Sequence, residues 1–272
     1  MEINGYTKLA AVVANPIKHS LSPFIHNLAF DHVGENGVYL AFETPEADLG
    51  AVIESIKTLN MYGVNLSMPY KETASQYMDE LSDVAKLTGA INTIVNQDGK
   101  LFGTSTDGAG FFKSLKNFQV KGSSITIIGA GGAARSIIAE AVFQGAGQIT
   151  VYNRTYKPEL FADYPGNIVF KPLSDLLELT GDLLVNTTSL GMDGVSLPIP
   201  SDLKFPGDML VADVIYQPIE TPLLTYAKAQ GHQTVNGLGM LLYQAAESFK
   251  LWTGQEMPTE MILKKLEEKI YG

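Results

Sequence analysis

The chain has 272 residues and a formal net charge of −10, and 45% of its residues are hydrophobic while 18% are charged. This length accommodates one large domain or two smaller ones, and the composition is that of a globular protein, which excludes a disordered one. The acidic balance argues against non-specific binding of nucleic acid, because such binding depends on a surplus of lysine and arginine.

The sequence contains no cysteine, which excludes disulfides, thiolate metal sites and a cysteine nucleophile. No apolar run reaches the roughly 18 residues that a membrane-spanning helix needs. The N-terminal segment MEINGYTKLAAVV has an acidic residue near its start and only a short apolar run, so it predicts a strand rather than a signal peptide. We therefore expect a cytoplasmic protein without membrane contact.

The first part of the chain alternates between strand and helix patterns. A continuous apolar run at Leu9–Ala14 is typical of a buried strand, and apolar residues at helical spacing follow in Ser22–Val33. Asp98-Gly99 is a strong hairpin turn signal between two strands. The predicted strands are Leu9–Ala14, Val38–Glu43, Gly63–Leu66, Thr93–Asn96 and Leu101–Thr104, and the predicted helices are Ser22–Val33, Pro45–Leu59, Lys71–Ser75 and Asp79–Leu87.

A motif typical of dinucleotide binding opens the second part of the chain. Ile125–Ile128 has strand character and runs into Gly129–Ala134, GAGGAA, a G-x-G-x-x-A pattern followed by helix-forming residues. The first glycine permits a tight turn, the second lets a pyrophosphate approach the backbone, and the small third residue lets the helix pack on the strand. The free N–H groups of the helix N-terminus would then hold the anion. An ordinary tight turn is the alternative, and the flanking strand and helix favour dinucleotide binding.

Strands and helices continue to alternate beyond this motif. The predicted strands are Gln148–Tyr152, Leu183–Asn186, Met209–Asp213 and Gln233–Val235, and the predicted helices are 133–145, 158–163, 173–179, 221–230, Leu238–Trp252 and Thr259–Ile270. This alternation predicts an α/β protein with a doubly wound parallel sheet. We expect a Rossmann-like dinucleotide domain at 108–236 and a substrate domain made of 1–107 and 237–272, to which the last helices return.

The residues after the second strand of the Rossmann-like domain indicate which dinucleotide binds. Domains that bind NAD carry an acidic residue about 20 positions beyond the glycines. At that place the sequence Val151–Thr155, VYNRT, has Arg154 instead of a carboxylate, and Lys157 follows. A guanidinium suits a phosphate in geometry and charge, so we predict NADP(H) rather than NAD, with a solvent-exposed surface arginine as the alternative.

Four other stretches carry more polar side chains than a structural role requires. Ser20–Pro23 places two hydroxyls before a helix, where a cap needs only one and two could hold a carboxylate. Asn65–Lys71 places an amide, a hydroxyl and an ammonium within seven residues, although a turn with an exposed lysine is the simpler interpretation. Asn92-Thr93 opens a strand, and Gly103–Gly108 enters a helix at which Asp107 could serve only as an N-cap.

Together with the glycine-rich motif, these stretches resemble the shikimate dehydrogenase family over the whole chain. The family motifs S-x-S-P, N-V-T-x-P-x-K, G-A-x-N-T, G-x-N/S-T-D-G, G-A-G-G-A-A, N-R-T and G-x-G-M-L-x-x-Q-A occur in this order. They stand at Ser20–Pro23, Asn65–Lys71, Gly89–Thr93, Gly103–Gly108, Gly129–Ala134, Asn153–Thr155 and Gly237–Ala245. Seven ordered motifs are far more specific than one. The segment Asp213–Leu223 also looks like the family's segment with a substrate-site tyrosine, here Tyr216.

The resemblance implies a role for each matching residue. Lys71 and Asp107 would form the catalytic pair, in which the Lys71 ammonium supplies a proton and polarises the carbonyl. The substrate-binding residues would be Ser20, Ser22, Asn65, Ser67, Asn92, Thr106, Tyr216 and Gln244, with the serines and Tyr216 on the carboxylate. The cofactor-binding residues would be Gly129, Ala130, Gly131, Gly132, Ala133, Ala134, Asn153, Arg154, Thr155, Lys157, Thr187 and Gly237.

The resemblance also implies the reaction. The family reduces 3-dehydroshikimate to shikimate with NADPH, reversibly, on the route to chorismate and the aromatic amino acids. We expect a small-molecule substrate, no metal and no nucleic acid. A homodimer is possible. None of His19, His26, His32 and His232 stands at a metal-ligand spacing such as H-x-x-x-H.

Two alternatives to this reaction stay open from the sequence. Ser67 replaces the usual threonine and Leu66 the usual valine, so a quinate/shikimate dehydrogenase with relaxed substrate or cofactor use is one alternative. A non-catalytic NADP-binding sensor on the same fold is the other, since fold alone does not fix function. Retention of Lys71 and Asp107 argues against the sensor, because a sensor does not need a proton donor.

Overall fold

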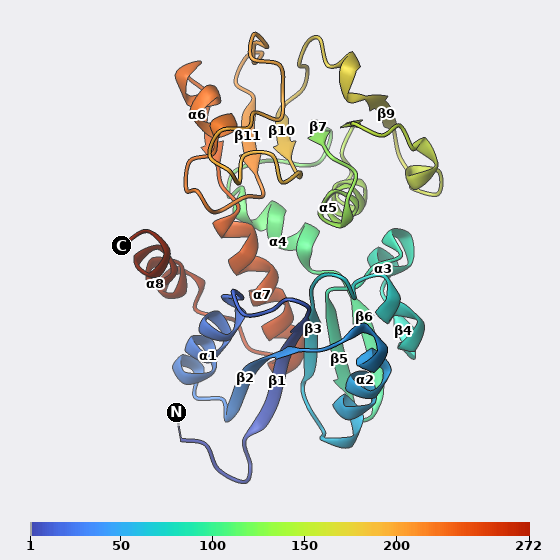
Figure 1. Ribbon diagram of the computed structural model, residues 1–272, viewed down its shortest axis with the longest axis vertical. Coiled ribbons are helices and arrows are strands. Elements are labelled where there is room, and N and C mark those ends of the chain that lie inside the picture. The colour runs from blue at the N-terminus through green and yellow to red at the C-terminus, as the bar shows by residue number, and fades with distance from the viewer. Residues whose placement is uncertain (1) are drawn as a thin grey trace. The chain divides into compact units, whose positions relative to one another are not determined.

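The computed structural model describes residues 2–272 and confirms the predicted α/β fold. The chain divides into two compact units, one of residues 1–110 and 242–272 and the other of residues 111–241, each built on a six-stranded sheet. The chain passes between the units within the helices α4 (Asp107–Ser114) and α7 (Leu238–Thr253), which Figure 1 labels. The domain boundaries predicted from the sequence fall a few residues before those of this division.

The first unit contains a mixed sheet in the order β2-β1-β3-β5-β6-β4 (Figure 1). Its strands are β1 (Lys8–Ala14), β2 (Gly37–Glu43), β3 (Gly63–Leu66), β4 (Glu80–Leu81), β5 (Thr93–Gln97) and β6 (Lys100–Thr104), and its other helices are α1 (Ser22–Val33), α2 (Leu49–Thr58), α3 (Asp83–Thr88) and α8 (Thr259–Tyr271). β1 runs parallel to β2 and β3, whereas β5 is antiparallel to β3 and β6. Asp98 and Gly99 both have positive φ angles, as the tight turn between β5 and β6 requires.

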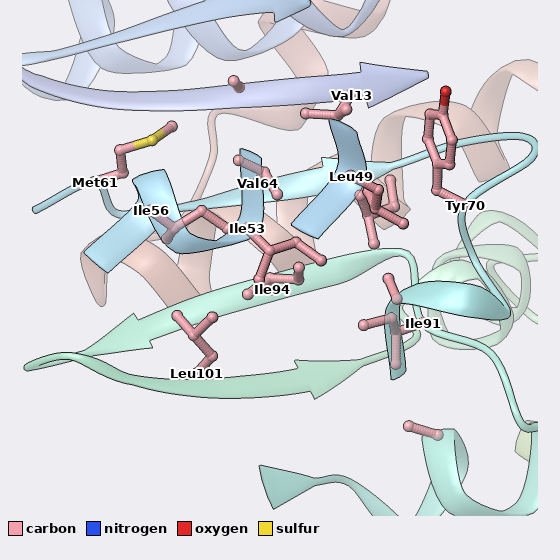
Figure 2. Close-up of a cluster of buried hydrophobic side chains, with 14 residues drawn as sticks. Val13, Leu49, Ile53, Ile56, Met61, Val64, Tyr70, Ile91, Ile94 and Leu101 are labelled. Atoms are coloured by element: carbon pink, nitrogen blue, oxygen red, sulfur yellow. The ribbon is translucent and has the colours of Figure 1, made fainter. Parts of the chain in front are cut away.

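The core of the first unit lies between α2 and the sheet. Leu49, Ile53 and Ile56 fall on one face of α2 because residues three and four apart lie above one another on a helix. Figure 2 shows them gathered with Val64 of β3 and Ile94 of β5, and all five are at most 3% exposed. Full burial of an aliphatic side chain of this size contributes about 1.5–3 kcal/mol, so this cluster fixes the strands whose ends carry the polar side chains described below.

The second unit contains a fully parallel sheet in the order β12-β11-β10-β7-β8-β9. Its strands are β7 (Ser124–Ile128), β8 (Gln148–Asn153), β9 (Ile168–Pro172), β10 (Leu183–Asn186), β11 (Leu210–Asp213) and β12 (Thr234–Val235), and its other helices are α5 (Gly132–Phe143) and α6 (Pro222–Ala229). The strand order reverses between β7 and β10. Ligands of open α/β sheets bind beyond the carboxyl ends of the strands at such a switch point.

Several predicted helices differ from those of the structure. Asp79–Leu87 is not one helix: residues 80–81 form β4, and α3 begins afterwards because Ser82 Oγ accepts the N–H of Ala85 at 3.1 Å. The predicted helices at 71–75, 158–163 and 173–179 are short 3-10 turns at Thr73–Tyr77, Pro158–Phe161 and Leu173–Asp175, and another such turn, Glu46–Asp48, precedes α2. β9 was not predicted, because its residues are partly exposed without the alternation that marks a half-buried strand.

Candidate active site

A lysine and an aspartate form a close ion pair in the first unit. Lys71 follows the loop after β3, and Asp107 is the first residue of α4. Lys71 Nζ lies 2.6 Å from Asp107 Oδ2, while the lysine side chain is 29% exposed and the aspartate side chain 10%. A largely buried carboxylate therefore holds the ammonium of a partly exposed lysine, which is the arrangement of a positioned proton donor.

The second oxygen of Asp107 is held by an amide. Asn92 Nδ2 donates to Asp107 Oδ1 at 2.8 Å and to Thr106 Oγ1 at 3.0 Å, and it lies 3.4 Å from Gln244 Oε1. Asn92 Oδ1 in turn accepts the backbone N–H of Thr106 at 2.9 Å. Both oxygens of Asp107 are thus bound by other side chains, so this carboxylate does more than cap the helix that it begins.

Gln244 reaches this network because α4 and α7 pack closely where it stands. A Cβ on Gly110 would lie only 2.4 Å from the backbone N of Gln244, which leaves no space for any other residue. Thr106 Oγ1 also donates to the backbone oxygen of Gln244 at 3.0 Å. The glycine of α4 therefore sets the approach that brings a residue of the C-terminal segment beside Asp107.

Asn65, at the end of β3, belongs to a second, buried part of the network. Its Nδ2 lies 3.0 Å from both Thr93 Oγ1 and Ser248 Oγ, and its Oδ1 accepts the hydroxyl proton of Tyr39 at 2.7 Å. The sequence interpretation singled out the stretch containing Thr93 but missed Tyr39 and Ser248 as members of this network. Ser248 stands one helical turn after Gln244, so its spacing could have identified it, whereas nothing in the strand containing Tyr39 distinguishes it from an ordinary core aromatic.

The serines of the S-L-S-P stretch are not conventional helix caps. The residue that caps α1 is Leu21, which has no side-chain capping bond, and Ser20 Oγ accepts the N–H of Ser22 at 3.3 Å. Ser20, Ser22 and Ser67, which follows β3, are all partly exposed, so their hydroxyls lie where a ligand can reach them.

The glycine-rich loop of the second unit has the features that a pyrophosphate needs. Gly129 has a φ of +109°, and a Cβ there would lie 2.5 Å from Thr187 Oγ1, so only glycine fits. Gly131 precedes α5 and provides no side-chain acceptor for its first N–H groups. A Cβ on Gly131 or Gly132 would meet nothing within 4 Å, so neither glycine is crowded by other residues. The N–H groups of a helix N-terminus of this kind suit an anion. Ala134 is fully buried, as the close packing of helix on strand requires.

Arg154 stands exposed just after β8 and lines a cavity of about 480 Å³. Leu190 and Pro198 provide apolar walls of the same cavity, and Asn153 Nδ2 closes the local turn by donating to the oxygen of Thr155 at 2.9 Å. Apolar walls suit a heterocyclic base, and an exposed guanidinium at the rim suits a phosphate attached to it. The residues of the second unit therefore fit a phosphorylated dinucleotide.

A buried carboxylate also organises the strand ends of the second unit. Asp213, only 1% exposed, accepts hydrogen bonds from Thr221 Oγ1 at 2.7 Å, from Asn186 Nδ2 at 3.1 Å and from the N–H of Ile215 at 3.1 Å. Burial raises the pKa of the Asp213 carboxyl, although these donors act in the opposite direction. The segment that begins here carries Tyr216, whose pKa burial also raises.

Gly237 packs against the same segment of the second unit. Its N–H donates to the oxygen of Ile215 at 2.9 Å, and a Cβ there would lie 1.9 Å from the oxygen of Val214. The position therefore admits only glycine. Tyr216 and Gly237, like the residues of the glycine-rich loop, belong to the second unit, whereas the other predicted substrate residues belong to the first.

Within residues 2–272, no group of three or more histidine, aspartate or glutamate side chains is placed to hold a metal ion. A helix both long and apolar enough to cross a membrane is likewise absent from this part of the chain.

Comparison with known proteins places these features in a family. The family model described as the shikimate dehydrogenase substrate binding domain matches residues 12–94, and that of the shikimate 5'-dehydrogenase C-terminal domain matches residues 237–267. Shikimate dehydrogenase (NADP(+)) of Streptococcus suis is 54% identical over 99% of both chains.

Two solved structures are similar to the chain over nearly its whole length. Shikimate 5-dehydrogenase of Listeria monocytogenes, in complex with shikimate and NAD, is 37% identical with a TM-score of 0.91 over 98% of both chains. The ligand-free 5-ketofructose reductase of a Gluconobacter species is 28% identical with a TM-score of 0.92, over 98% of this chain and 100% of the other. The fold therefore occurs with more than one substrate.

Proposed function

The chain belongs to the shikimate dehydrogenase family, and we propose that the Lys71–Asp107 pair carries its chemistry. Its reaction is the reversible reduction of 3-dehydroshikimate to shikimate with NADP(H). The observation that supports the proposal most directly is the 2.6 Å contact between a partly exposed ammonium and a carboxylate held by Asn92.

Reduction of a ketone needs a hydride on carbon and a proton on oxygen. NADPH, when bound, supplies the hydride. Lys71 donates the proton to the carbonyl oxygen and stabilises the charge that develops there, and in the reverse direction neutral Lys71 accepts the hydroxyl proton. Asp107 holds the ammonium in place, since its other oxygen is fixed by Asn92.

The first unit is proposed to bind the substrate. Ser20 and Ser22 would bind the carboxylate, because partly exposed hydroxyls beside a helix start can donate to an anion. Tyr216 is a further proposed contact of the carboxylate. The hydroxyls of the ring would be held by Asn65, Ser67, Asn92, Thr106 and Gln244. The amide network around Asn92 supports this assignment, because its members are held rigidly and lie beside Asp107.

The second unit is proposed to bind NADP(H). The N–H groups at the start of α5 would hold the pyrophosphate, and Arg154 with Lys157 would hold the 2′-phosphate beside the apolar cavity. The further contacts proposed are Gly129, Ala130, Gly131, Gly132, Ala133, Ala134, Asn153, Thr155, Thr187 and Gly237.

A comparison of substrates and cofactors tests this function. Oxidation of NADPH with 3-dehydroshikimate should be much faster than with 3-dehydroquinate or 5-ketofructose, and faster than oxidation of NADH with the same ketone. The comparison with NADH is informative because the Listeria structure contains NAD, so a dehydrogenase with relaxed cofactor use is a second candidate function. Binding of NADPH without turnover of any of these ketones would instead support a sensor. A homodimer and a cytoplasmic location stay predictions.

A further inference from the structure

One helix holds a single tyrosine of the neighbouring strand in two ways. α1 packs beside β2 in the first unit (Figure 1). Asn27 of α1 hydrogen-bonds both the N–H and the oxygen of Tyr39, each at 2.8 Å. The ring of His26 stacks on that of Tyr39 with 4.2 Å between centroids and 5° between planes. Backbone and ring are therefore both fixed by α1.

The imidazole in this stack has no polar role of its own. His26 is fully buried, and neither of its ring nitrogens has a hydrogen-bond partner. Its other ring neighbours are Phe249 and Trp252 of α7. A polar ring that is buried without partners costs stability, so the position serves a purpose that offsets this cost. The one group on which it acts directly and which reaches the polar network is Tyr39.

The tyrosine hydroxyl in turn determines how Asn65 presents its amide. The two N–H groups of Asn65 have three acceptors within 3.2 Å: the oxygen of Asn92, Thr93 Oγ1 and Ser248 Oγ. Tyr39 donates its only proton to Asn65 Oδ1 from the opposite side. With both N–H groups occupied, Asn65 can meet a substrate only through the remaining lone pair of its oxygen. It must therefore accept a hydrogen bond from a ring hydroxyl rather than donate one.

We propose that Tyr39 is a positioning residue for substrate recognition, held by α1 and acting through Asn65. Its hydroxyl fixes the orientation in which Asn65 accepts a hydrogen bond from a ring hydroxyl of the substrate. The inference rests on the proposed function, in which Asn65 contacts the substrate.

Tyr39→Phe tests the proposal because it removes only the hydroxyl oxygen and keeps the ring stacked on His26. KM for shikimate should rise about tenfold, the loss expected for one well-placed hydrogen bond, while kcat falls less and KM for NADP+ stays unchanged. Tyr62→Phe is the matched control: Tyr62 is a buried tyrosine of the same unit whose hydroxyl donates to Glu35, away from the network. It should leave KM for shikimate unchanged.

A second pair of variants tests the role of the stack. His26→Leu should raise KM for shikimate although Tyr39 is intact, and His26→Phe, which restores a ring, should return it toward the wild-type value. If Tyr39→Phe does not fold, this pair of variants still tests whether Tyr39 acts as a positioning residue. Wild-type KM in Tyr39→Phe, or equal KM changes in the leucine and phenylalanine variants, would overturn the inference. A wild-type chain that does not oxidise shikimate would refute the proposed function instead.

Discussion

Each unit buries a carboxylate beside an asparagine, but the two carboxylates have different partners. Asp107 in the first unit accepts from Asn92 and pairs with the ammonium of Lys71, which is partly exposed. Asp213 in the second unit accepts from Asn186, from Thr221 and from a backbone N–H, all of them neutral donors. The same amide–carboxylate contact therefore serves a charged pair in one unit and a closed neutral network in the other.

The difference teaches which buried acids can take part in proton transfer. A carboxylate beside a cation that reaches solvent can hold a group that gives and takes protons. A carboxylate whose donors are neutral and buried fixes the loops that carry those donors, and its own charge is a cost of burial. The following predictions test this distinction, beginning with the largest expected effect.

Removal of the cation of the charged pair should have the largest effect. Lys71→Ala should lower kcat by two to four powers of ten, because the proton is needed only as charge develops on the carbonyl oxygen. KM should change much less, since several other groups hold the ring. If Lys71 and Asp107 act together, the double variant Lys71→Ala with Asp107→Asn should have a kcat only slightly below that of the slower single variant. Unchanged kcat with a raised KM would make Lys71 a binding residue.

The uncharged buried base His26 should set the acid stability of the first unit. Burial lowers the pKa of His26 to about 3, from 6.5 in an unfolded chain. Because the folded value is depressed, the full contribution is present above pH 6.5 and is lost as pH falls from there toward 3, by about 1.4 kcal/mol per pH unit. Denaturant unfolding at about pH 4.5 should find His26→Phe more stable relative to wild type than at pH 7.5. Parallel pH curves would contradict this assignment.

The exposed cation of the second unit should act on binding rather than on turnover. Arg154, unlike Lys71, is exposed and lies at the rim of an apolar cavity. Arg154→Asp should weaken NADPH by about 1.5–3 kcal/mol and NADH much less, because it replaces a phosphate partner with a like charge. KM values for both cofactors, compared at equal shikimate, measure the difference. An equal loss for both would mean that Arg154 does not contact the 2′-phosphate.

The neutral network should show the smallest effect, and on stability rather than on kcat. Asp213→Asn should lower the free energy of unfolding by about 1–3 kcal/mol, because donors of Asn186, Thr221 or Ile215 lose an acceptor. Since burial raises the pKa of Asp213 above its usual 3.8, wild type should gain stability over the variant as pH falls through the raised pKa toward 3.8. A loss of kcat as large as that of Lys71→Ala would remove the contrast between the two carboxylates.

The sequence predicted the elements with a strong periodic pattern and the residues that stand in recognisable motifs. The parallel strands other than β4 and β9, and the hairpin at Asp98-Gly99, followed from apolar runs and turn chemistry, and Lys71 with Asp107 followed from a family resemblance. Ser82 was not recognised as the start of a helix, because the helical pattern around it extends further than its cap allows. Tyr39 was missed because its importance depends on a contact with Asn65 across the sheet, which no local pattern records.

The discontinuity of the first unit has a consequence for how the protein is made. Ser248 and Trp252 come from the end of the chain, yet Ser248 bonds Thr93 and Trp252 Nε1 donates to the oxygen of Ile94 at 3.0 Å. During synthesis the strands carrying these partners leave the ribosome first, and a whole second unit follows before their contacts exist. The polar interior of the first unit therefore stays incomplete until the C-terminal segment has been synthesised. Chains that terminate before this segment should be degraded by proteases rather than accumulate as partly active enzyme.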